Sequence, residues 1–465
     1  MTAPAPADVL RRGGQPAVVH VVGIGGAGMS AIATVLQAMG HVVTGSDLKA
    51  SGVTERLQRG GIGVTIGHDA ANVGAADLVT VSSAIPETNP EVAEARSRGL
   101  AVLSRAESLA AIASLRRCVA VAGTHGKTTT ASMLALLLVE AGLRPSFLIG
   151  GDVNEIGTNA VWDEGEWLVL EADESDGTFL SLVPEIAVVT NVEADHLDHY
   201  GSFDAVRSAF EVFVAAARHY RVVGGDDPVA AELGALTGAD TVGTTPECTY
   251  RMVDVELARS SLAFGLLDPS GSSLGHLAVP VPGLHNAKNA AVAAVAALAV
   301  GVPFESLARA LARFAGVARR FEFRGTMDGV TFVDDYAHLP SEVRAALAAA
   351  GNGGWPRVVA VFQPHRYSRT SELWAEFGRS FADADEVVVT EVYGAGEAPV
   401  PGVSGRLVAD AARHEYPGTP VHYVAGRSDL RSAVRALLRP GDLCLTLGAG
   451  DLTSLPDELL ADADR

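Results

Sequence analysis

The stretch Gly123-Thr124-His125-Gly126-Lys127-Thr128-Thr129 decides the fold of this chain, because it joins an apolar run to a helical pattern. The apolar run is Cys118 to Ala122, and the helical pattern extends from Ala131 to Ala141. A glycine-rich turn between a buried strand and a helix presents backbone N–H groups to phosphate oxygens. In such a turn Lys127 would neutralise phosphate charge, and Thr128 would reach a Mg²⁺ ion. The stretch therefore predicts a loop that binds nucleotide phosphates, and a glycine-rich turn with a surface lysine is the weaker interpretation.

A second glycine motif lies near the N-terminus. Gly23, Gly25 and Gly28 satisfy the pattern GxGxxG directly after the apolar run Val18 to Val22, and the acidic Asp47 follows about 20 residues later. This pattern is typical of a Rossmann unit, in which glycines allow a pyrophosphate to approach the backbone. Taken alone, it favours an NAD-dependent oxidoreductase. Because any diphosphate fits such a loop and a second nucleotide loop follows, we favour another diphosphate, such as that of a UDP-sugar.

Strand signals recur in three segments, in which β-branched runs pass into glycines or turns. Further runs of this kind are Val42–Thr44, Leu78–Val81, Ala101–Leu103, Trp167–Leu170, Ile186–Thr190, Thr331–Val333, Val358–Phe362, Glu386–Thr390 and Leu443–Leu447. The signals weaken between Val222 and Val281, where we expect short strands and loops, and helices are expected at Ala290–Leu298 and Phe304–Phe314. At 465 residues the chain is long enough for about three domains of ~150 residues. We therefore predict an α/β protein with a flexible leader at 1–16, a Rossmann-like domain at 17–116, a central P-loop ATPase-like domain with a mostly parallel sheet at 117–318, and a C-terminal Rossmann-like domain at 319–465.

The composition argues against several classes of protein. The formal net charge of −20 disfavours nucleic-acid binding, which needs a basic surface. Cys118, Cys248 and Cys444 lie far apart without a CxxC motif, so neither a disulfide framework nor a zinc site is expected. No apolar segment follows Arg11-Arg12 as in a signal peptide, and the apolar run Ala290–Val300 is too short to span a bilayer. We therefore expect a cytoplasmic protein without membrane insertion, and both a monomer and a homodimer remain open.

Acidic residues follow two predicted strands of the central segment. Glu171 ends the first of these strands and begins the acidic segment Glu171 to Asp176, and the segment Asp195 to His199 follows the second. Acids at the carboxyl ends of parallel strands beside a phosphate loop are typical of Mg²⁺ sites. A solvated polar loop is the alternative for Asp195 to His199, but in this setting a metal or nucleotide role is favoured.

Polar clusters also mark the later part of the chain. The motif Pro282 to Asn289 leads into an alanine-rich helix, and its asparagines could cap that helix or contact an adenine edge or a phosphate. It contains Lys288, one of only three lysines in the chain, with Lys49 and Lys127. Three more clusters lie at domain edges or strand ends: Arg319-Arg320, Asp334 to His338 and Gln363 to Thr370. Each could be surface charge, but together they favour a site for anions.

In this order the motifs resemble the Mur ligase family, the muramyl ligases of peptidoglycan synthesis, from about Val18 to Asp451. The family's phosphate loop has the short form GT(H/N)GKTT, which accounts for Val121 where the general pattern GxxxxGK[ST] has glycine. The blocks that are similar to the L-alanine-adding branch are Gly23–Ser30, Gly45–Asp47, Ser82–Pro86, Asn89–Glu91, Glu171–Asp176, Asp334–His338, Gln363–Thr370 and Gly448–Asp451.

The resemblance implies an ATP-dependent ligase that joins L-alanine to the lactyl carboxylate of UDP-N-acetylmuramate in peptidoglycan precursor synthesis. The carboxylate would receive the γ-phosphate, giving ADP and an acyl phosphate, and the amine would then displace phosphate. The three predicted domains would bind the UDP-sugar, ATP and the amino acid, in that order. The alternatives are a sister ligase that adds a peptide to the same nucleotide sugar during recycling and, more remotely, an NAD-dependent oxidoreductase.

The resemblance also implies roles for individual residues. ATP would be bound by Gly123, Thr124, His125, Gly126, Lys127, Thr128, Thr129, His285, Asn286 and Asn289. The UDP-substrate would be bound by Gly25, Gly26, Ala27, Gly28, Met29, Ser30, Asp47, His68, Ser83, Glu174 and Ser175. L-alanine and the acyl phosphate would be positioned by His338, His365, Arg366 and Arg369. Thr128 and Glu171 would hold one Mg²⁺ ion and His196 a second. The catalytic group would comprise Lys127, Glu171, His196, Arg320 and Asp335, of which the last two would reach the nucleotide from across a domain boundary.

Two departures from the family pattern qualify these roles. Sister ligases carry a carbamylated lysine near the second metal, but this chain has no lysine between Lys127 and Lys288. Glu211 could at most take its place. The third-domain motif often has two consecutive histidines, whereas Leu339 follows His338 here. The strictness of the enzyme for L-alanine over glycine or serine is therefore open.

Overall fold

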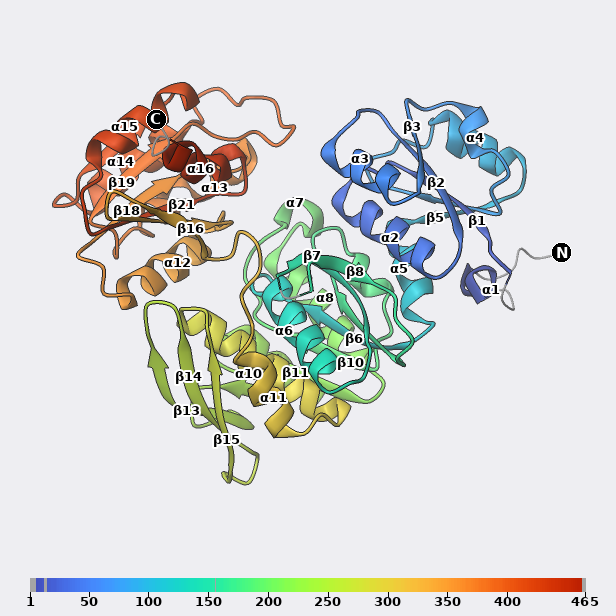
Figure 1. Ribbon diagram of the computed structural model, residues 1–465, viewed down its shortest axis with the longest axis horizontal. Helices are drawn as coiled ribbons and strands as arrows, with labels where there is room; N and C mark the ends of the chain where they lie inside the picture. The colour runs from blue at the N-terminus through green and yellow to red at the C-terminus, as the bar shows by residue number, and fades with distance from the viewer. Residues whose placement is uncertain (1–5, 12–14, 155, 462–465) are drawn as a thin grey trace. The chain divides into compact units, whose positions relative to one another are not determined.

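The computed structural model describes residues 6–11, 15–154 and 156–461 (Figure 1). Residues 1–5 and 12–14 of the predicted leader lie outside the described residues, while Pro6–Arg11 forms helix α1 with Val9 and Leu10 buried. The chain divides into two compact units. The first comprises the residues before Asp254 together with Leu266–Gly275 and Lys288–Leu311, and the second comprises Asp254–Gly265, His276–Ala287 and the residues from Ala312 onward. The bounds of three domains remain a prediction.

A five-stranded parallel sheet forms the N-terminal part of the first unit, in the order β3-β2-β1-β4-β5. Its strands are β1 (Val18–Val22), β2 (Val42–Asp47), β3 (Gly63–Ile66), β4 (Leu78–Val81) and β5 (Ala101–Ser104). Its helices are α2 (Ala27–Ala38), α3 (Gly52–Arg59), α4 (Pro90–Ser97) and α5 (Arg105–Ala113), with a 3-10 turn η1 (Ala70–Val73). The order reverses direction beside β1, which is the point where doubly wound sheets bind ligands. The first glycine loop, Gly23–Gly28, follows β1 there.

A ten-stranded sheet has the order β15-β14-β13-β12-β11-β10-β6-β9-β7-β8. Its strands are β6 (Arg117–Ala122), β7 (Ser146–Val153), β8 (Thr158–Val161), β9 (Trp167–Glu171), β10 (Ile186–Val189), β11 (Tyr220–Gly224), β12 (Asp240–Gly243), β13 (Tyr250–Leu257), β14 (Leu262–Leu267) and β15 (Ser273–Val279). The helical segments that belong to this part of the chain are α6 (Lys127–Glu140), η2 (Thr178–Ser181), α7 (Leu197–Tyr200), α8 (Phe203–Ala215), α9 (Pro228–Thr237), α10 (Leu284–Val300) and α11 (Phe304–Leu311). Strand β6 pairs in parallel with β9 and β10, so the loop that follows it lies at the centre of a parallel sheet.

A six-stranded sheet in the second unit has the order β16-β17-β21-β18-β19-β20. Its strands are β16 (Glu322–Met327), β17 (Val330–Asp335), β18 (Arg357–Phe362), β19 (Glu386–Thr390), β20 (Val421–Val424) and β21 (Asp442–Leu447). All pairs are parallel except β16 with β17. The remaining helical segments are α12 (Pro340–Asn352), α13 (Tyr367–Gly378), α14 (Gly405–Glu415), α15 (Arg427–Leu437), η3 (Asp451–Ser454) and α16 (Leu455–Leu460).

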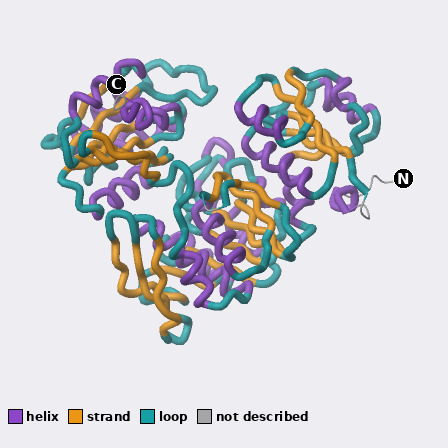
Figure 2. The backbone as a smooth tube through the Cα atoms, viewed as in Figure 1, coloured by secondary structure: helices purple, strands orange, loops and turns teal. Residues whose placement is uncertain are grey.

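These sheets and their intervening helices confirm the predicted α/β class, and Figure 2 shows helices in purple beside strands in orange. Two expectations about helices were incomplete, and strands β3, β7, β8, β16 and β20 were not predicted. Helix α9 lies in the stretch where only short strands and loops were expected, and its start is marked by Asp227, whose side chain accepts a hydrogen bond from the backbone of Ala230. Helix α10 begins at Leu284, so the polar motif before Ala290 is already helical. Within the described residues, no helix combines the length and apolarity needed to cross a membrane.

Candidate functional site

The phosphate loop, residues 123–126, connects β6 to α6 and is braced by the segment that follows β10. Asn191 Oδ1 accepts a hydrogen bond from the backbone N–H of His125 (2.9 Å), and Asn191 Nδ2 donates to the carbonyl oxygen of the same residue (3.0 Å). Thr124 Oγ1 accepts from the backbone N–H of Glu193 (2.8 Å). Gly126 precedes the helix in the left-handed region, with φ 77°. The loop is therefore held in the shape of an anion-binding turn at a helix N-terminus.

Lys127, the first residue of α6, turns back onto the loop. Its Nζ donates to the carbonyl oxygens of Gly123 (2.7 Å) and Thr124 (3.3 Å), and to Glu174 Oε1 (2.7 Å). Burial acts to lower the pKa of Lys127, but the carboxylates of Glu174, Glu171 and Asp173 outweigh it, and the pKa is raised. Burial raises the pKa of Glu174 to about 7, against the effect of Lys127. Glu174 was predicted to contact the UDP-substrate, and the structure places it against the phosphate-loop lysine.

Thr128 and Glu171 form a pair of oxygen donors beside the loop. Thr128 Oγ1 lies 3.0 Å from Glu171 Oε1, and Glu171 Oε2 accepts from the backbone N–H of Gly150 (2.6 Å). His196 Nε2 lies 3.3 Å from Asp195 Oδ2 and 3.9 Å from Glu174 Oε1. Among the residues that the structure describes, no three His, Cys, Asp or Glu side chains gather as a metal cluster. A hydroxyl and a carboxylate at this distance nevertheless suit a hard cation such as Mg²⁺, which keeps part of its shell for water and phosphate.

Helix α10 brings Asn289 to the phosphate loop. A Cβ atom on Gly126 would lie 2.4 Å from Asn289 Oδ1, so this side chain packs directly on the glycine. One position earlier, Lys288 Nζ lies 3.0 Å from Asp226 Oδ2, which ties the helix to the loop after β11. Asn286 is buried and donates from Nδ2 to the carbonyl oxygen of Pro282 (2.7 Å), a local contact at the start of the helix. His285 lies against Gly283, where an added Cβ would be 2.6 Å from its Cε1 atom.

The first glycine loop has its acidic partner in place. The backbone N–H of Gly25 donates to Asp47 Oδ2 (2.9 Å), and a Cβ on Gly25 would lie 2.8 Å from the same oxygen. Gly26 precedes helix α2 and Ala27 begins it, and in the first turn Met29 is buried. The backbone N–H of Ser30 closes this turn by donating to the carbonyl oxygen of Gly26 (2.9 Å). Ser83 is exposed in the turn after β4.

His68 belongs to a buried polar network centred on Glu91, which is fully buried. His68 Nδ1 lies 3.1 Å from Ser46 Oγ and 3.2 Å from Glu91 Oε2. Ser46 Oγ donates to the same carboxylate (2.5 Å), as does Asn72 Nδ2 (2.6 Å). Burial acts to raise the pKa of Glu91, but these donors and His20, 3.6 Å away, lower it to about 2. The network fixes the ring of His68 beside the end of β2.

Arg105, which sequence reasoning missed, connects the first glycine loop to the acidic segment after β9 within the first unit. Its guanidinium lies 2.9 Å from Asp173 Oδ2 and 3.6 Å from Asp176 Oδ2. A Cβ on Gly28 would lie 3.0 Å from Arg105 Nε. Asp173 in turn accepts from the backbone N–H of Ser175 (3.0 Å). Although burial acts to raise it, the pKa of Asp173 is lowered to about 2, mainly by Arg105.

The second unit holds its own group of predicted residues at the end of β17. Asp335 is buried and accepts backbone hydrogen bonds from Phe321 and Ala337, both at 2.8 Å. Burial raises the pKa of Asp335 to about 6, although Arg320 acts to lower it. The Arg320 guanidinium lies over the ring of Tyr336 (5.1 Å) and 3.9 Å from Glu342. Its neighbour Arg319 lies over the same ring (4.7 Å) and also contacts Asp334 (3.5 Å) and the carbonyl oxygen of Gly448 (2.8 Å).

Two neutral imidazoles lie next to this group. The rings of His338 and His365 are 5.9 Å apart edge to face, and Tyr393 stacks on His365 at 5.8 Å. Burial lowers the pKa of both histidines to about 4, and for His365 the charges of His338, Arg369 and Arg366 add to this effect. Arg366 precedes α13 with φ 69°. Tyr336 belongs to the predicted cluster Asp334–His338, whereas Glu342 and Tyr393 were missed as members, because each lies outside any predicted motif and is brought in by the fold.

The structure also shows where Leu339 and Glu211 lie, the two residues connected with the departures from the family pattern. Leu339 is buried at the start of α12, where its backbone N–H donates to Glu342 Oε2 (3.1 Å). Glu211 is exposed on α8.

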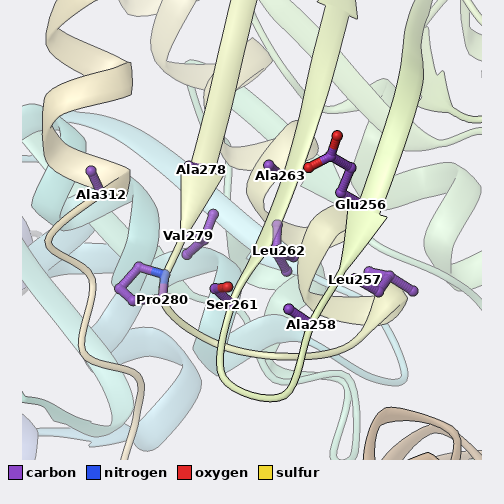
Figure 3. Close-up of a pocket in the computed structure, with 10 residues that line it drawn as sticks. All are labelled: Glu256, Leu257, Ala258, Ser261, Leu262, Ala263, Ala278, Val279, Pro280 and Ala312. Carbon is purple, nitrogen blue, oxygen red and sulfur yellow. The ribbon is translucent and has the colours of Figure 1, made fainter. Parts of the chain in front are cut away.

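The pocket drawn in Figure 3 lies by the ends of β13, β14 and β15 and is lined mostly by aliphatic side chains, with Glu256 and Ser261. None of the predicted site residues lines it.

Three family models match the chain in sequence. They are described as "Mur ligase family, catalytic domain" over residues 18–117, "Mur ligase middle domain" over residues 121–297, and "Mur ligase, glutamate ligase domain" over residues 319–450. Together they cover most of the chain.

Relatives of known name match nearly the whole chain. The UDP-N-acetylmuramate–L-alanine ligase of Rubrobacter xylanophilus is 47% identical over 95% of this chain and 99% of its own length. The ligase of the same name from Pelotomaculum thermopropionicum is 45% identical over 95% of this chain and 96% of its own. The crystal structure of UDP-N-acetylmuramate-alanine ligase from Thermotoga maritima matches with a TM-score of 0.81 at 29% identity, over 96% of this chain and 99% of that one. A murein peptide ligase from Psychrobacter arcticus shares the fold, with a TM-score of 0.67 at 24% identity over 96% and 98%.

Proposed function

The chain belongs to the Mur ligase family, and on that premise we propose that it is an ATP-dependent ligase that joins L-alanine to the lactyl carboxylate of UDP-N-acetylmuramate. The observation that carries the proposal is the presence of two glycine loops in the first unit, each after a central parallel strand. One suits a diphosphate and the other a nucleoside triphosphate. An NAD-dependent oxidoreductase needs only the first loop. The names of the relatives favour L-alanine over a recycled peptide as the second substrate.

The reaction follows from the chemistry of a carboxylate, which is a poor acyl donor until one oxygen becomes a leaving group. A carboxylate oxygen attacks the γ-phosphorus of ATP, and the bond to ADP breaks. The amine nitrogen of L-alanine then attacks the carbonyl carbon of the acyl phosphate, and the tetrahedral intermediate collapses with loss of inorganic phosphate and a proton from nitrogen. Lys127 and the amides of the phosphate loop would hold the phosphates while negative charge gathers.

We propose Mg²⁺ at Thr128 and Glu171, whose oxygen atoms fit a hard cation. When bound there, the ion would neutralise charge on the phosphates. The family pattern places a second ion at His196. If that assignment holds, His196→Ala will require a higher Mg²⁺ concentration for half-maximal activity, and an unchanged Mg²⁺ titration will refute it.

The residues of the second unit suit an amino acid and an acyl phosphate. The low pKa values of His338 and His365 keep both imidazoles neutral at pH 7, so they can hydrogen-bond an amino acid without repelling its ammonium group. Arg366 and Arg369 would pair with its carboxylate or with phosphate. Arg320 and Asp335 would contact the nucleotide. Because ATP and nucleotide sugars are cytoplasmic metabolites, we place the reaction in the cytoplasm.

The test is phosphate release with purified protein, ATP and Mg²⁺, together with mass spectrometry of the amide. We expect ADP and phosphate only when UDP-N-acetylmuramate and L-alanine are both present. The same assay with glycine, L-serine and a tripeptide in place of L-alanine tests the acceptor specificity, which the departure at Leu339 leaves open. Turnover with the tripeptide but not with L-alanine would overturn the proposed substrate.

A further inference from the structure

The ammonium group of Lys127 has an acceptor for each of its three protons. Two are carbonyl oxygens of its own loop, Gly123 at 2.7 Å and Thr124 at 3.3 Å. The third is the carboxylate of Glu174 at 2.7 Å. A phosphate-loop lysine acts by contacting the β- and γ-phosphates of the nucleotide. One of these three contacts must therefore give way when ATP binds.

Glu174 is the partner that resembles a phosphate. It is a carboxylate residue with only about 2% of its surface exposed, and it approaches Lys127 from the acidic segment after β9. Its backbone carbonyl accepts a hydrogen bond from Tyr200 Oη (2.5 Å), which holds this residue in place beside the loop. Among the described residues, Glu174 Oε2 is buried without a hydrogen-bond partner. The carboxylate is thus held beside Lys127 although half of its acceptor capacity is unused, a costly arrangement for a purely structural contact.

We propose that Glu174 is a displaceable counter-ion of Lys127, which pairs with the lysine and competes for it with the phosphates of ATP. The carboxylate keeps the lysine ordered and directed at the loop, and it weakens nucleotide binding by the free energy of the pair that must be broken. This inference rests on the proposed binding of ATP at the loop, but not on the identity of the amino-acid substrate.

The test measures the Kd of ATP by calorimetry, with Mg²⁺ and without the other two substrates. We expect Glu174→Gln to bind ATP about threefold to tenfold more tightly than the wild type, because a neutral amide competes less well for an ammonium than a carboxylate does. Asp173→Asn is the matched control. It removes one negative charge from the same segment, but from a side chain that pairs with Arg105 at 2.9 Å. The gain in ATP affinity in Asp173→Asn should be clearly smaller than in Glu174→Gln.

A double-mutant cycle with Lys127→Met shows whether the gain acts through the lysine. In the Lys127→Met background, Glu174→Gln should no longer change the Kd of ATP. Unchanged or weaker ATP binding in Glu174→Gln overturns the proposal, as does an equal gain in Asp173→Asn or a gain that persists without the lysine. If Glu174→Gln fails to fold, Glu174→Asp replaces it, since its shorter side chain lengthens the contact and should also tighten binding. If wild-type protein binds ATP but forms no amide with L-alanine, the proposed substrate fails while this inference stands.

Discussion

Gly126 and Gly142 both have positive φ angles, of 77° and 73°, at the two ends of helix α6. Their surroundings differ. A Cβ on Gly126 would meet Asn289 Oδ1 at 2.4 Å, whereas a Cβ on Gly142 would meet nothing within 4 Å. The two positions therefore share the backbone strain of a left-handed conformation, but only Gly126 lies in the phosphate loop and in contact with α10.

Gly126→Ala should weaken ATP binding by about tenfold or more, and Gly142→Ala should leave it unchanged. Each alanine costs about 1 kcal/mol of stability from the left-handed backbone, so similar losses of thermal stability are expected from strain alone. Only the first also displaces Asn289 from the loop. The measurement is the Kd of ATP beside a melting curve for each variant. Equal ATP binding in both variants would show that the contact with Asn289 is irrelevant to the nucleotide.

The pKa of His338 predicts a dependence of stability on pH. Burial lowers this pKa from 6.5 to about 4 in the folded protein. Between these values the unfolded chain binds a proton at His338 and the folded chain does not, so stability is present above pH 6.5 and is lost as the pH falls toward 4. The contribution approaches about 1.4 kcal/mol per pH unit inside that window. The free energy of unfolding of the wild type, measured with urea relative to that of His338→Gln, should therefore be lower at pH 5 than at pH 7. A difference that is the same at both pH values would refute the assigned pKa.

At the scale of elements, many buried central strands could be predicted, whereas strands such as β3, β8 and β20 and some helix boundaries could not. Leu78–Val81 and Glu386–Thr390 are strands over the predicted residues, because buried parallel strands are continuous β-branched runs. Helix α9 was missed because its apolar residues follow no strong helical period, although Asp227 and Pro228 mark its start. The start of α10 was placed too late because the polar motif was interpreted as leading into the helix rather than as part of it. In the folded chain that motif is the first turn of the helix.

Lys288 holds the start of α10 against the loop after β11, because its Nζ atom lies 3.0 Å from Asp226 Oδ2. Asp226 is itself fixed by the backbone N–H of Thr244 (2.8 Å). Lys288→Ala should raise the KM for ATP about twofold to fivefold with little change in kcat, since a partly exposed pair contributes about 0.5–1 kcal/mol. Arg309→Ala on α11, which removes an exposed pair with Glu140 (3.4 Å), is the control and should leave the KM unchanged. A fall in kcat alone would contradict a role in positioning α10.

At the scale of the whole molecule, sequence motifs identified the residues near each ligand loop but not their partners. Both glycine loops are local patterns in which spacing alone implies chemistry. Arg105 with Asp173 and Lys127 with Glu174 join residues 68 and 47 positions apart, and no local pattern encodes such pairs. The network around Glu91 likewise collects residues from β1, β2, α4 and the loop after β3. Such contacts form only when the fold brings these distant segments together.

The two loops in the first unit should be separable by mutation, because they present different groups to different ligands. Lys127→Ala removes the cation of the phosphate loop and should abolish turnover, while the Kd of UDP-N-acetylmuramate stays within about twofold of the wild-type value. Gly25→Ala is the reciprocal variant. Its Cβ would lie 2.8 Å from Asp47 Oδ2 and so displace the carboxylate that accepts from the Gly25 backbone. It should weaken UDP-substrate binding by about tenfold and leave the Kd of ATP unchanged, since an overpacked contact costs about 1–3 kcal/mol locally. Calorimetry with each ligand alone gives both constants, and loss of both ligands in either variant would mean a single shared site or a misfolded unit.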